Sequence, residues 1–182
     1  GFVGGFVLGK VPRLARIAAP VVEFCRAIPA PAIVPILLLL VGIGERSQIS
    51  LIAFGTLWPV LVSTTDGVRS IDPVYIDTGR SFGIPFWRTT FGITIPASLP
   101  QVFAGIKTSL SIGIILMVIS EMVGSTNGVG YFILQAQRGF AMREMWAGII
   151  LLGLLGWLLN LAFELIERRC LSWYQGSRAR HD

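Results

Sequence analysis

The sequence has little charge, a single histidine and few cysteines for a chain of 182 residues. Only 14% of its residues are charged, whereas soluble domains carry about 25%. This deficit excludes a disordered protein, a nucleic-acid-binding protein and almost any ordinary cytosolic enzyme. Cys25 and Cys170 are isolated, so they predict neither a disulfide framework nor a metal cage. With 53% hydrophobic residues and a mean hydropathy of +0.73, the sequence indicates an integral membrane protein.

Long uncharged stretches predict the membrane spans, because a helix needs about 20 mostly apolar residues to cross a bilayer. The 27–44 stretch contains Pro29, Pro31 and Pro35, which a bundle can accommodate when neighbouring helices satisfy the freed carbonyls. Residues 122–137 are also uncharged, but their Gly124–Gly130 segment has the composition of a turn, which predicts a loop or a re-entrant element. The four predicted spans are 27–44, 47–65, 99–120 and 145–163.

The first nine residues are apolar but cover only about half of a hydrocarbon core of about 30 Å. We therefore interpret residues 1–9 as the end of a truncated span. Gly1, Gly5 and Gly9 recur every four residues. This spacing is typical of close contacts between membrane helices, and it equally fits the general abundance of glycine in such helices.

The basic residues predict the orientation. With the 66–97 loop on one side, that side carries eleven of the 15 Lys and Arg residues, the other side carries three, and Lys107 lies within a span. The positive-inside rule then places the loop and the C-terminus in the cytoplasm. The eleven are Lys10, Arg13, Arg16, Arg26, Arg69, Arg80, Arg88, Arg168, Arg169, Arg178 and Arg180, and the three are Arg46, Arg138 and Arg143.

The 66–97 loop contains signals for one short helix. Asp72-Pro73 is typical of a helix start, and Gly83 followed by Pro85 is typical of a helix end. A helix of about ten residues is too short to be stable alone in water, so we expect it to pack on something. The alternatives are a membrane surface, contacted by its aromatic residues, and a groove in a soluble partner.

A motif in this loop resembles the EAA loop of ABC importer permeases. The family pattern is Glu-Ala-Ala, three residues, Gly, nine residues, Ile, one residue, Leu-Pro. Here Asp77-Thr78-Gly79 is followed at the same spacing by Gly83 and by Ile93-Thr94-Ile95-Pro96. Asp77 replaces Glu, Thr78 and Gly79 replace the two Ala residues, and Ile95 replaces Leu. Further segments resemble the nitrate/sulfonate/taurine branch of these permeases: Arg26–Pro29, Gly42–Glu45, Gly67–Pro73, Ser120–Met122, Gly128–Tyr131 and Glu167–Arg169.

The resemblance implies an all-α, polytopic transmembrane domain of the MetI-like type, with residues 1–182 forming one domain. It implies a permease subunit of an ATP-driven importer in the bacterial inner membrane, paired with a second copy or another permease. A periplasmic binding protein would deliver a small, anionic solute of the sulfonate, taurine or nitrate type. Cytoplasmic ATPase subunits would hold ATP and Mg²⁺, so this chain would bind no cofactor and catalyse no covalent reaction. The coupling residues implied by the motif are Asp77, Thr78, Gly79, Gly83, Ile93 and Pro96.

Charged residues near or within the 99–120 span are candidates for the translocation path, because ionisable groups are costly inside a bilayer. Lys107 lies about 12 Å along the helix from Leu99. It could face the path, extend toward the headgroups or form an internal ion pair. Ser111 can share its helix face. Glu121 lies at the outer end of the span, where it faces either arriving solute or solvent.

Two other classes of protein remain as alternatives. A secondary transporter would also have buried charges and broken helices, but it would not need a cytoplasmic docking loop. A membrane-embedded enzyme would need clustered ligands or a nucleophile. However, the only histidine is His181 in the tail, and no His-Glu-x-x-His pattern or nucleophile elbow is present.

Overall fold

The computed structural model describes residues 1–173, apart from the side chain of Arg80, and its regular elements are all helical. This confirms the predicted all-α fold. Arg178, Arg180 and His181 lie outside the described residues. The elements are α1 (Phe2–Lys10), α2 (Pro12–Ala27), η1 (Ala30–Ile33), α3 (Val34–Val41), α4 (Glu45–Arg69), α5 (Pro73–Ser81), α6 (Phe86–Thr89), η2 (Thr90–Thr94), α7 (Ile95–Gly124), α8 (Val129–Arg138) and α9 (Met142–Cys170).

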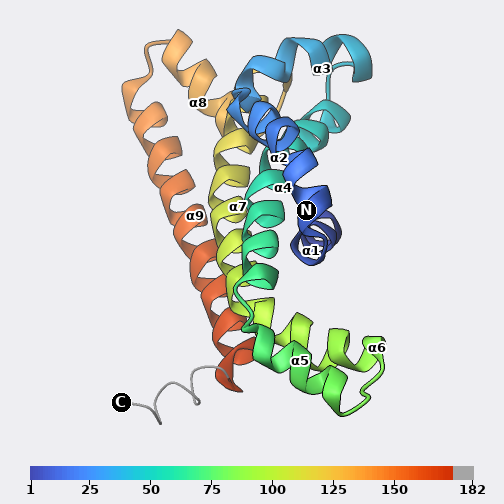
Figure 1. The fold of residues 1–182 in the computed structure, drawn as a ribbon. Helices are drawn as coiled ribbons and strands as arrows, with labels where there is room; N and C mark the ends of the chain where they lie inside the picture. Colours follow the sequence, from blue (N-terminus) through green and yellow to red (C-terminus); the bar gives the residue numbers. More distant parts are fainter. Residues whose placement is uncertain (174–182) are drawn as a thin grey trace.

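The centre of the bundle is the antiparallel pair of α4 and α7, which pack closely because small residues line their contact (Figure 1). A Cβ built on Gly105 would lie 2.6 Å from the Cβ of Ser63. In addition, Ser109 Oγ donates a hydrogen bond to the Thr56 carbonyl oxygen at 2.8 Å. Because lipid is as apolar as the helices, close packing and interhelical hydrogen bonds hold such a pair together.

Helix α1 packs on α4 through the repeated glycines. A Cβ on Gly5 would lie 2.4 Å from the Leu61 carbonyl oxygen, and one on Gly9 would lie 2.5 Å from the Cβ of Val68. Thr65 Oγ1 also donates to the carbonyl oxygen of Gly5 at 3.2 Å. The four-residue spacing of glycine therefore marks a close helix contact, which decides between the two interpretations of the sequence.

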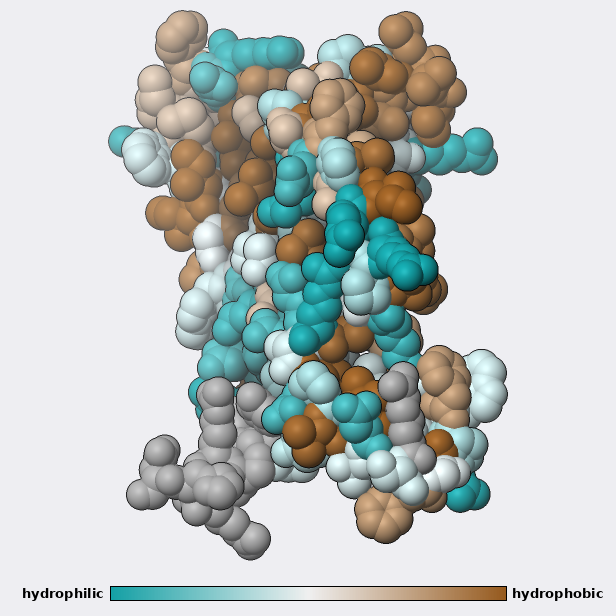
Figure 2. Space-filling model, viewed as in Figure 1, coloured by the Kyte–Doolittle hydropathy of each residue, from teal (hydrophilic) through white to brown (hydrophobic). Residues whose placement is uncertain are grey.

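Within residues 1–173, three helices are long and apolar enough to cross a membrane: α4, the run from Phe86 to Gly124 that contains α7, and α9. The predicted spans 47–65, 99–120 and 145–163 each lie inside one of these helices. An apolar 18-residue window of α9 has no buried residue, so its large apolar side chains face outward. Figure 2 shows further apolar residues around the upper part of the bundle. Such surfaces suit lipid rather than water.

The predicted span 27–44 is not a single helix. Helix α2 ends at Ala27, and the chain then turns by 81° into η1 and α3, which together cover residues 30–41. Ile28 and Pro29 have extended backbones at this turn. For Ile28 the reason is that a residue before proline is disfavoured in the helical region. The prolines therefore interrupt the helix here, so α2 and η1–α3 together can form at most one bent span.

Residues 122–137, predicted as a loop or re-entrant element, are mostly helical. Helix α7 continues to Gly124, and α8 begins at Val129. The turn is confined to residues 125–128, where Gly128 has a φ of +105° and Ser125 Oγ donates to the Asn127 carbonyl oxygen at 2.7 Å. The turn composition therefore predicts residues 125–128 correctly, whereas residues 122–124 and 129–137 are helical. Figure 1 places α3 and α8 at one end of the bundle and α5 and α6 at the other.

Candidate functional site

The start of α5 follows from its first two residues. Asp72 Oδ1 accepts a hydrogen bond from the backbone N–H of Val74 at 2.9 Å, which satisfies one of the free donors of the first turn. Pro73 occupies the first helical position, where its missing N–H has no cost. The short predicted helix therefore begins where its sequence indicates.

The end of α5 is a left-handed turn at Gly83. Gly83 has a φ of +65°, and the backbone N–H of Ile84 donates to the Gly79 carbonyl oxygen at 2.9 Å. This six-to-one bond is the mark of a Schellman helix end. A Cβ built on Gly83 would meet no atom of the described part of the chain within 4 Å. The backbone conformation, and not lack of space, therefore favours glycine here.

Helices α5 and α6 form a hairpin that extends from one end of the bundle (Figure 1). Gly79 is buried, and a Cβ on it would lie 3.4 Å from Thr89 Oγ1 of α6. On the outer side, Trp87 contacts the rings of Phe86 and Phe91 with centroid separations of 5.8 and 6.3 Å. We call the exposed apolar side chains of this hairpin the loop surface: Val74, Tyr75, Phe82, Phe86, Trp87 and Phe91.

The residues predicted for coupling lie along this hairpin and its exit. Asp77 and Thr78 are exposed on α5, while Ile93 and Pro96 are half-buried in η2 and at the start of α7. Helix α6, the π-type turn η2 and α7 follow one another without an interruption from residue 86 to residue 124. The motif residues therefore lie on one continuous piece of structure that leads directly into a membrane span.

Lys10 connects this hairpin to the N-terminal helix. Its Nζ donates to Thr90 Oγ1 at 2.5 Å and lies 4.2 Å from the ring centroid of Phe86 and 4.9 Å from that of Phe6. Such cation–π contacts gain strength when the cation is partly desolvated. Sequence reasoning missed this role. The sequence signal for this role is a single lysine at the end of an apolar segment.

Of the predicted path residues, Lys107 and Ser111 lie together and Glu121 lies apart. Lys107 and Ser111 are exposed on the same face of α7, and Ser111 Oγ is 3.5 Å from the carbonyl oxygen of Lys107. Glu121 is fourteen residues further along α7, or about 21 Å along the helix axis. The structure therefore does not bring the three side chains into one site.

Glu121 caps the neighbouring helix. Its Oε2 accepts a hydrogen bond from the backbone N–H of Gly130 at 2.7 Å, within the first turn of α8. A Cβ on Gly128 would lie 2.4 Å from the Glu121 carboxyl carbon, so this close approach requires glycine there. A carboxylate at a helix N-terminus is stabilised by the free N–H groups and the helix dipole. Glu121 therefore has a structural partner in addition to any role in a path.

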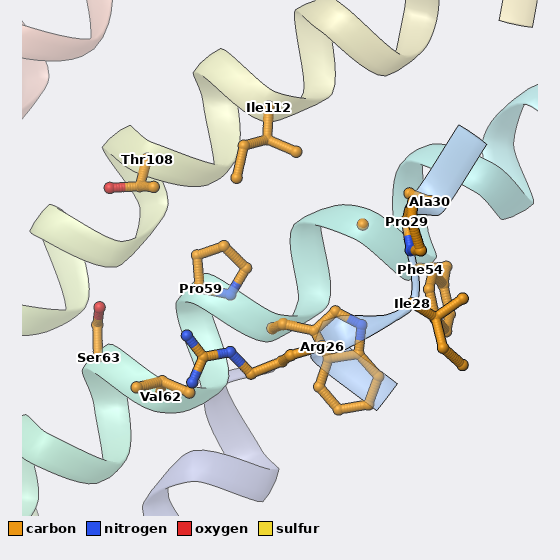
Figure 3. Close-up of a pocket in the computed structure, with 12 residues that line it drawn as sticks. Arg26, Ile28, Pro29, Ala30, Phe54, Pro59, Val62, Ser63, Thr108 and Ile112 are labelled. Carbon is orange, nitrogen blue, oxygen red and sulfur yellow. The ribbon is translucent and has the colours of Figure 1, made fainter. Parts of the chain in front are cut away.

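A pocket of about 510 Å³ lies between the end of α2, η1, α4 and α7 (Figure 3). Its charged residue is Arg26, whose guanidinium extends toward Pro59 and Val62. The count of basic residues places Arg26 in a cytoplasmic loop, and this prediction is wrong. Residues of α2 from Ala15 to Arg26 line a pocket together with the second half of α4, and Arg26 lies beside the middle of α4. Without Arg26 the count of basic residues is still ten against three, so the predicted orientation is unchanged.

Comparison with known proteins identifies the family. Residues 1–171 match the family described as "Binding-protein-dependent transport system inner membrane component". The chain belongs to this family. It is a multi-pass membrane protein of the permease type, and the family consists of transport components rather than enzymes.

The relatives of this permease agree with the branch that its motifs indicate. It is 32% identical over 97% of its length to the putative aliphatic sulfonates transport permease protein SsuC of Bacillus subtilis, of which it covers 65%. It is 29% identical over 96% of its length to the taurine transport system permease protein TauC of Escherichia coli, of which it covers 63%. The chain therefore spans slightly less than two thirds of these relatives.

A solved structure supports the fold. The chain matches a structure titled "Inward facing conformations of the MetNI methionine ABC transporter" with a TM-score of 0.71. The match covers 92% of this permease and 88% of that chain at 22% identity. At this identity the match shows the fold alone, and it confirms the predicted MetI-like architecture.

Proposed function

We propose that this permease forms the translocation path of an ATP-driven importer for small anionic solutes of the sulfonate or taurine type. The observation that carries the proposal is α5. It is a short helix, capped at Asp72 and ended at Gly83, that extends from one end of the bundle. The EAA-like motif assigns this helix to contact with an ATPase subunit. The substrate class follows from the relatives, which are named as aliphatic sulfonates and taurine transport permeases.

The geometry of the hairpin suits mechanical coupling. The loop surface offers exposed apolar contacts, with Tyr75 62% and Phe82 79% exposed, as a groove in a soluble partner would require. Thr89 packs over Gly79, so α5 and α6 would move as one unit. Because residues 86–124 are helical throughout, displacement of the hairpin would act directly on α7. Alternating access needs such a connection between a docking element and a packed span.

In this proposal the remaining components of the transporter are separate chains. ATP and Mg²⁺ bind to the ATPase subunits and this chain holds no cofactor. A periplasmic binding protein delivers the solute, and a second permease, identical or related, completes the path. The α5 end of the bundle faces the cytoplasm. A cysteine introduced at Ser81 would then react only from the cytoplasm, and one at Gln48 only from outside.

Copurification and transport test the proposal together. We expect Tyr75→Asp to lower the amount of ATPase subunit recovered per permease and to reduce ATP-dependent uptake of labelled taurine or ethanesulfonate into proteoliposomes. Phe140→Asp is the matched control, because Phe140 is 82% exposed at the opposite end of the bundle. Its φ of +54° is one that aspartate tolerates. Uptake driven by an ion gradient without ATP would instead identify a secondary transporter.

A further inference from the structure

The pocket beside Arg26 lies at the middle of a membrane span. The residues of α4 that line it run from Phe54 to Ser63. These positions are about 14 Å and 9 Å from the two ends of α4 at 1.5 Å per residue. An ionisable side chain at such a depth is costly, and it usually faces a cavity or a partner with a functional role.

The charge of Arg26 is not matched by a carboxylate. None of the residues that line the pocket is acidic. Glu23 and Asp66 line the adjoining pocket on the other side of Arg26, yet within residues 1–173 neither forms a salt bridge with it. A guanidinium has five N–H donors and no acceptor. An anion is therefore the partner that this side chain lacks.

Trp58 and Ser63 also line the pocket. The indole Nε1 of Trp58 is buried beneath the pocket surface and, among the side chains that the structure describes, has no hydrogen-bond partner, so a rotation of the indole would be needed to bring this donor to a ligand. Buried polar atoms without a partner are rare in native proteins. Ser63 adds a hydroxyl group from the next part of α4, on the side toward which the Arg26 guanidinium extends (Figure 3). The polar groups thus include a cation and a donor-only indole, which suit oxygen acceptors.

The other walls of the pocket are apolar. Phe54 and Ile28 lie on one side, and Ile112 of α7 lies on another (Figure 3). A volume of about 510 Å³ is within the range of small-molecule sites, which combine apolar walls with a few placed polar groups. The combination of an anionic head and a short carbon chain matches both parts of this lining.

We propose that this pocket binds one small aliphatic sulfonate during its passage through the permease. Arg26 binds the sulfonate oxygens, the Trp58 indole adds its N–H once it rotates toward the pocket, and Phe54 and Ile112 contact the carbon chain. The proposal rests on the importer function proposed above and assigns its substrate a position. A phospholipid phosphate has related oxyanion chemistry, so the test must distinguish a bound sulfonate from a bound lipid.

The test measures equilibrium binding of radiolabelled hexanesulfonate to the permease–ATPase complex in nanodiscs of phosphatidylcholine. We expect Arg26→Gln to weaken binding about ten-fold or more and Trp58→Phe by a smaller factor, because hydrogen bonds to charged groups are the stronger ones. Arg26→Lys should restore part of the affinity by keeping the charge. Arg16→Gln is the matched control, since Arg16 lies on the same helix and lines a different pocket. Hexanol, which has no charge, should not compete.

Each contrary outcome has a definite meaning. Unchanged binding in both Arg26→Gln and Trp58→Phe, with normal ATPase recovery, would overturn the site. Phosphatidylglycerol retained by the wild type but not by Arg26→Gln, without hexanesulfonate binding, would assign the pocket to lipid instead. ATP-dependent uptake that Arg26→Gln leaves intact would refute the pocket and preserve the importer function. Arg26-dependent binding without ATP-dependent uptake would preserve the site and refute the importer.

Discussion

Replacement of Gly83 should uncouple the permease from its ATPase without disturbing its spans. Gly83 holds a φ of +65°, and this turn lets the Ile84 N–H reach the Gly79 carbonyl oxygen. Among the atoms that the structure describes, none lies within 4 Å of a Cβ at this position, so Gly83→Ala introduces no clash with them. Its cost is therefore backbone strain alone, confined to the end of α5.

The size of the effect follows from the turn and from the length of the helix. A residue with a Cβ in the left-handed region costs about 1–2 kcal/mol, a factor of roughly 5–30 in an equilibrium. Helix α5 has nine residues, and isolated helices this short are marginal. We therefore expect the equilibrium between the native turn at the end of α5 and other conformations to shift against the native turn by about that factor in Gly83→Ala. The shift should be smaller in Gly83→Asn, because asparagine tolerates this conformation.

The assay compares Gly83→Ala with a glycine that lacks the special conformation. Gly92 also has no atom within 4 Å of its Cβ position but has an ordinary φ, so Gly92→Ala is the matched control. The ATPase subunit recovered per permease, and ATP-dependent taurine uptake, should both fall in Gly83→Ala and recover in part in Gly83→Asn. If Gly83→Ala and Gly92→Ala behave alike, the turn at Gly83 has no part in docking.

Three further substitutions probe other contacts of the structure. Gly5→Ala should lower thermal stability in detergent by about 1–3 kcal/mol, because its Cβ would lie 2.4 Å from a backbone oxygen of α4. Gly4→Ala is the control and should leave the stability unchanged, because its Cβ would lie 3.6 Å from the nearest side chain. Gly79→Ala should slow hydrogen exchange of α5 by stabilising the helix by about 0.5–1 kcal/mol, since the 3.4 Å approach to Thr89 leaves room; faster exchange would show that the hairpin cannot admit the methyl group. Glu121→Ala should lower thermal stability by about 1–3 kcal/mol, because a backbone N–H of α8 loses its acceptor; unchanged stability with lost uptake would indicate a path role instead.

The elements that local chemistry determines could be predicted from the sequence. Asp72-Pro73 and Gly83 define both ends of α5 through hydrogen bonds between residues close in the chain. The long apolar runs likewise predict α4, α7 and α9, because a bilayer imposes one length on any helix that crosses it. In these cases the information lies within about twenty consecutive residues.

The features that the sequence did not reveal depend on packing between distant segments. A count of basic residues places each one in the nearest gap between spans, so it places Arg26 in a loop. In the structure α2 returns beside α4, which brings Arg26 to the middle of that helix. The role of Glu121 depends on the approach of α8, nine residues further on, to the end of α7. A helix can contain a proline, as α4 contains Pro59. Whether the prolines from Pro29 to Pro35 interrupt a helix depends on the segments packed around them, which the sequence alone does not show.

Helices α4 and α7 connect the hairpin to the Arg26 pocket. Helix α7 leads directly from η2 to Ile112, which lines the pocket. On the other side, Lys10 ties the hairpin to α1, and α1 packs against α4 with no space for an additional methyl group at Gly5 or Gly9. A displacement of the hairpin therefore acts on both α7 and, through α1, on α4. Because these helices form two walls of the pocket, we expect a displacement of the hairpin to change the width of the pocket, and in the proposed importer this change would alter the affinity of the pocket for a bound sulfonate.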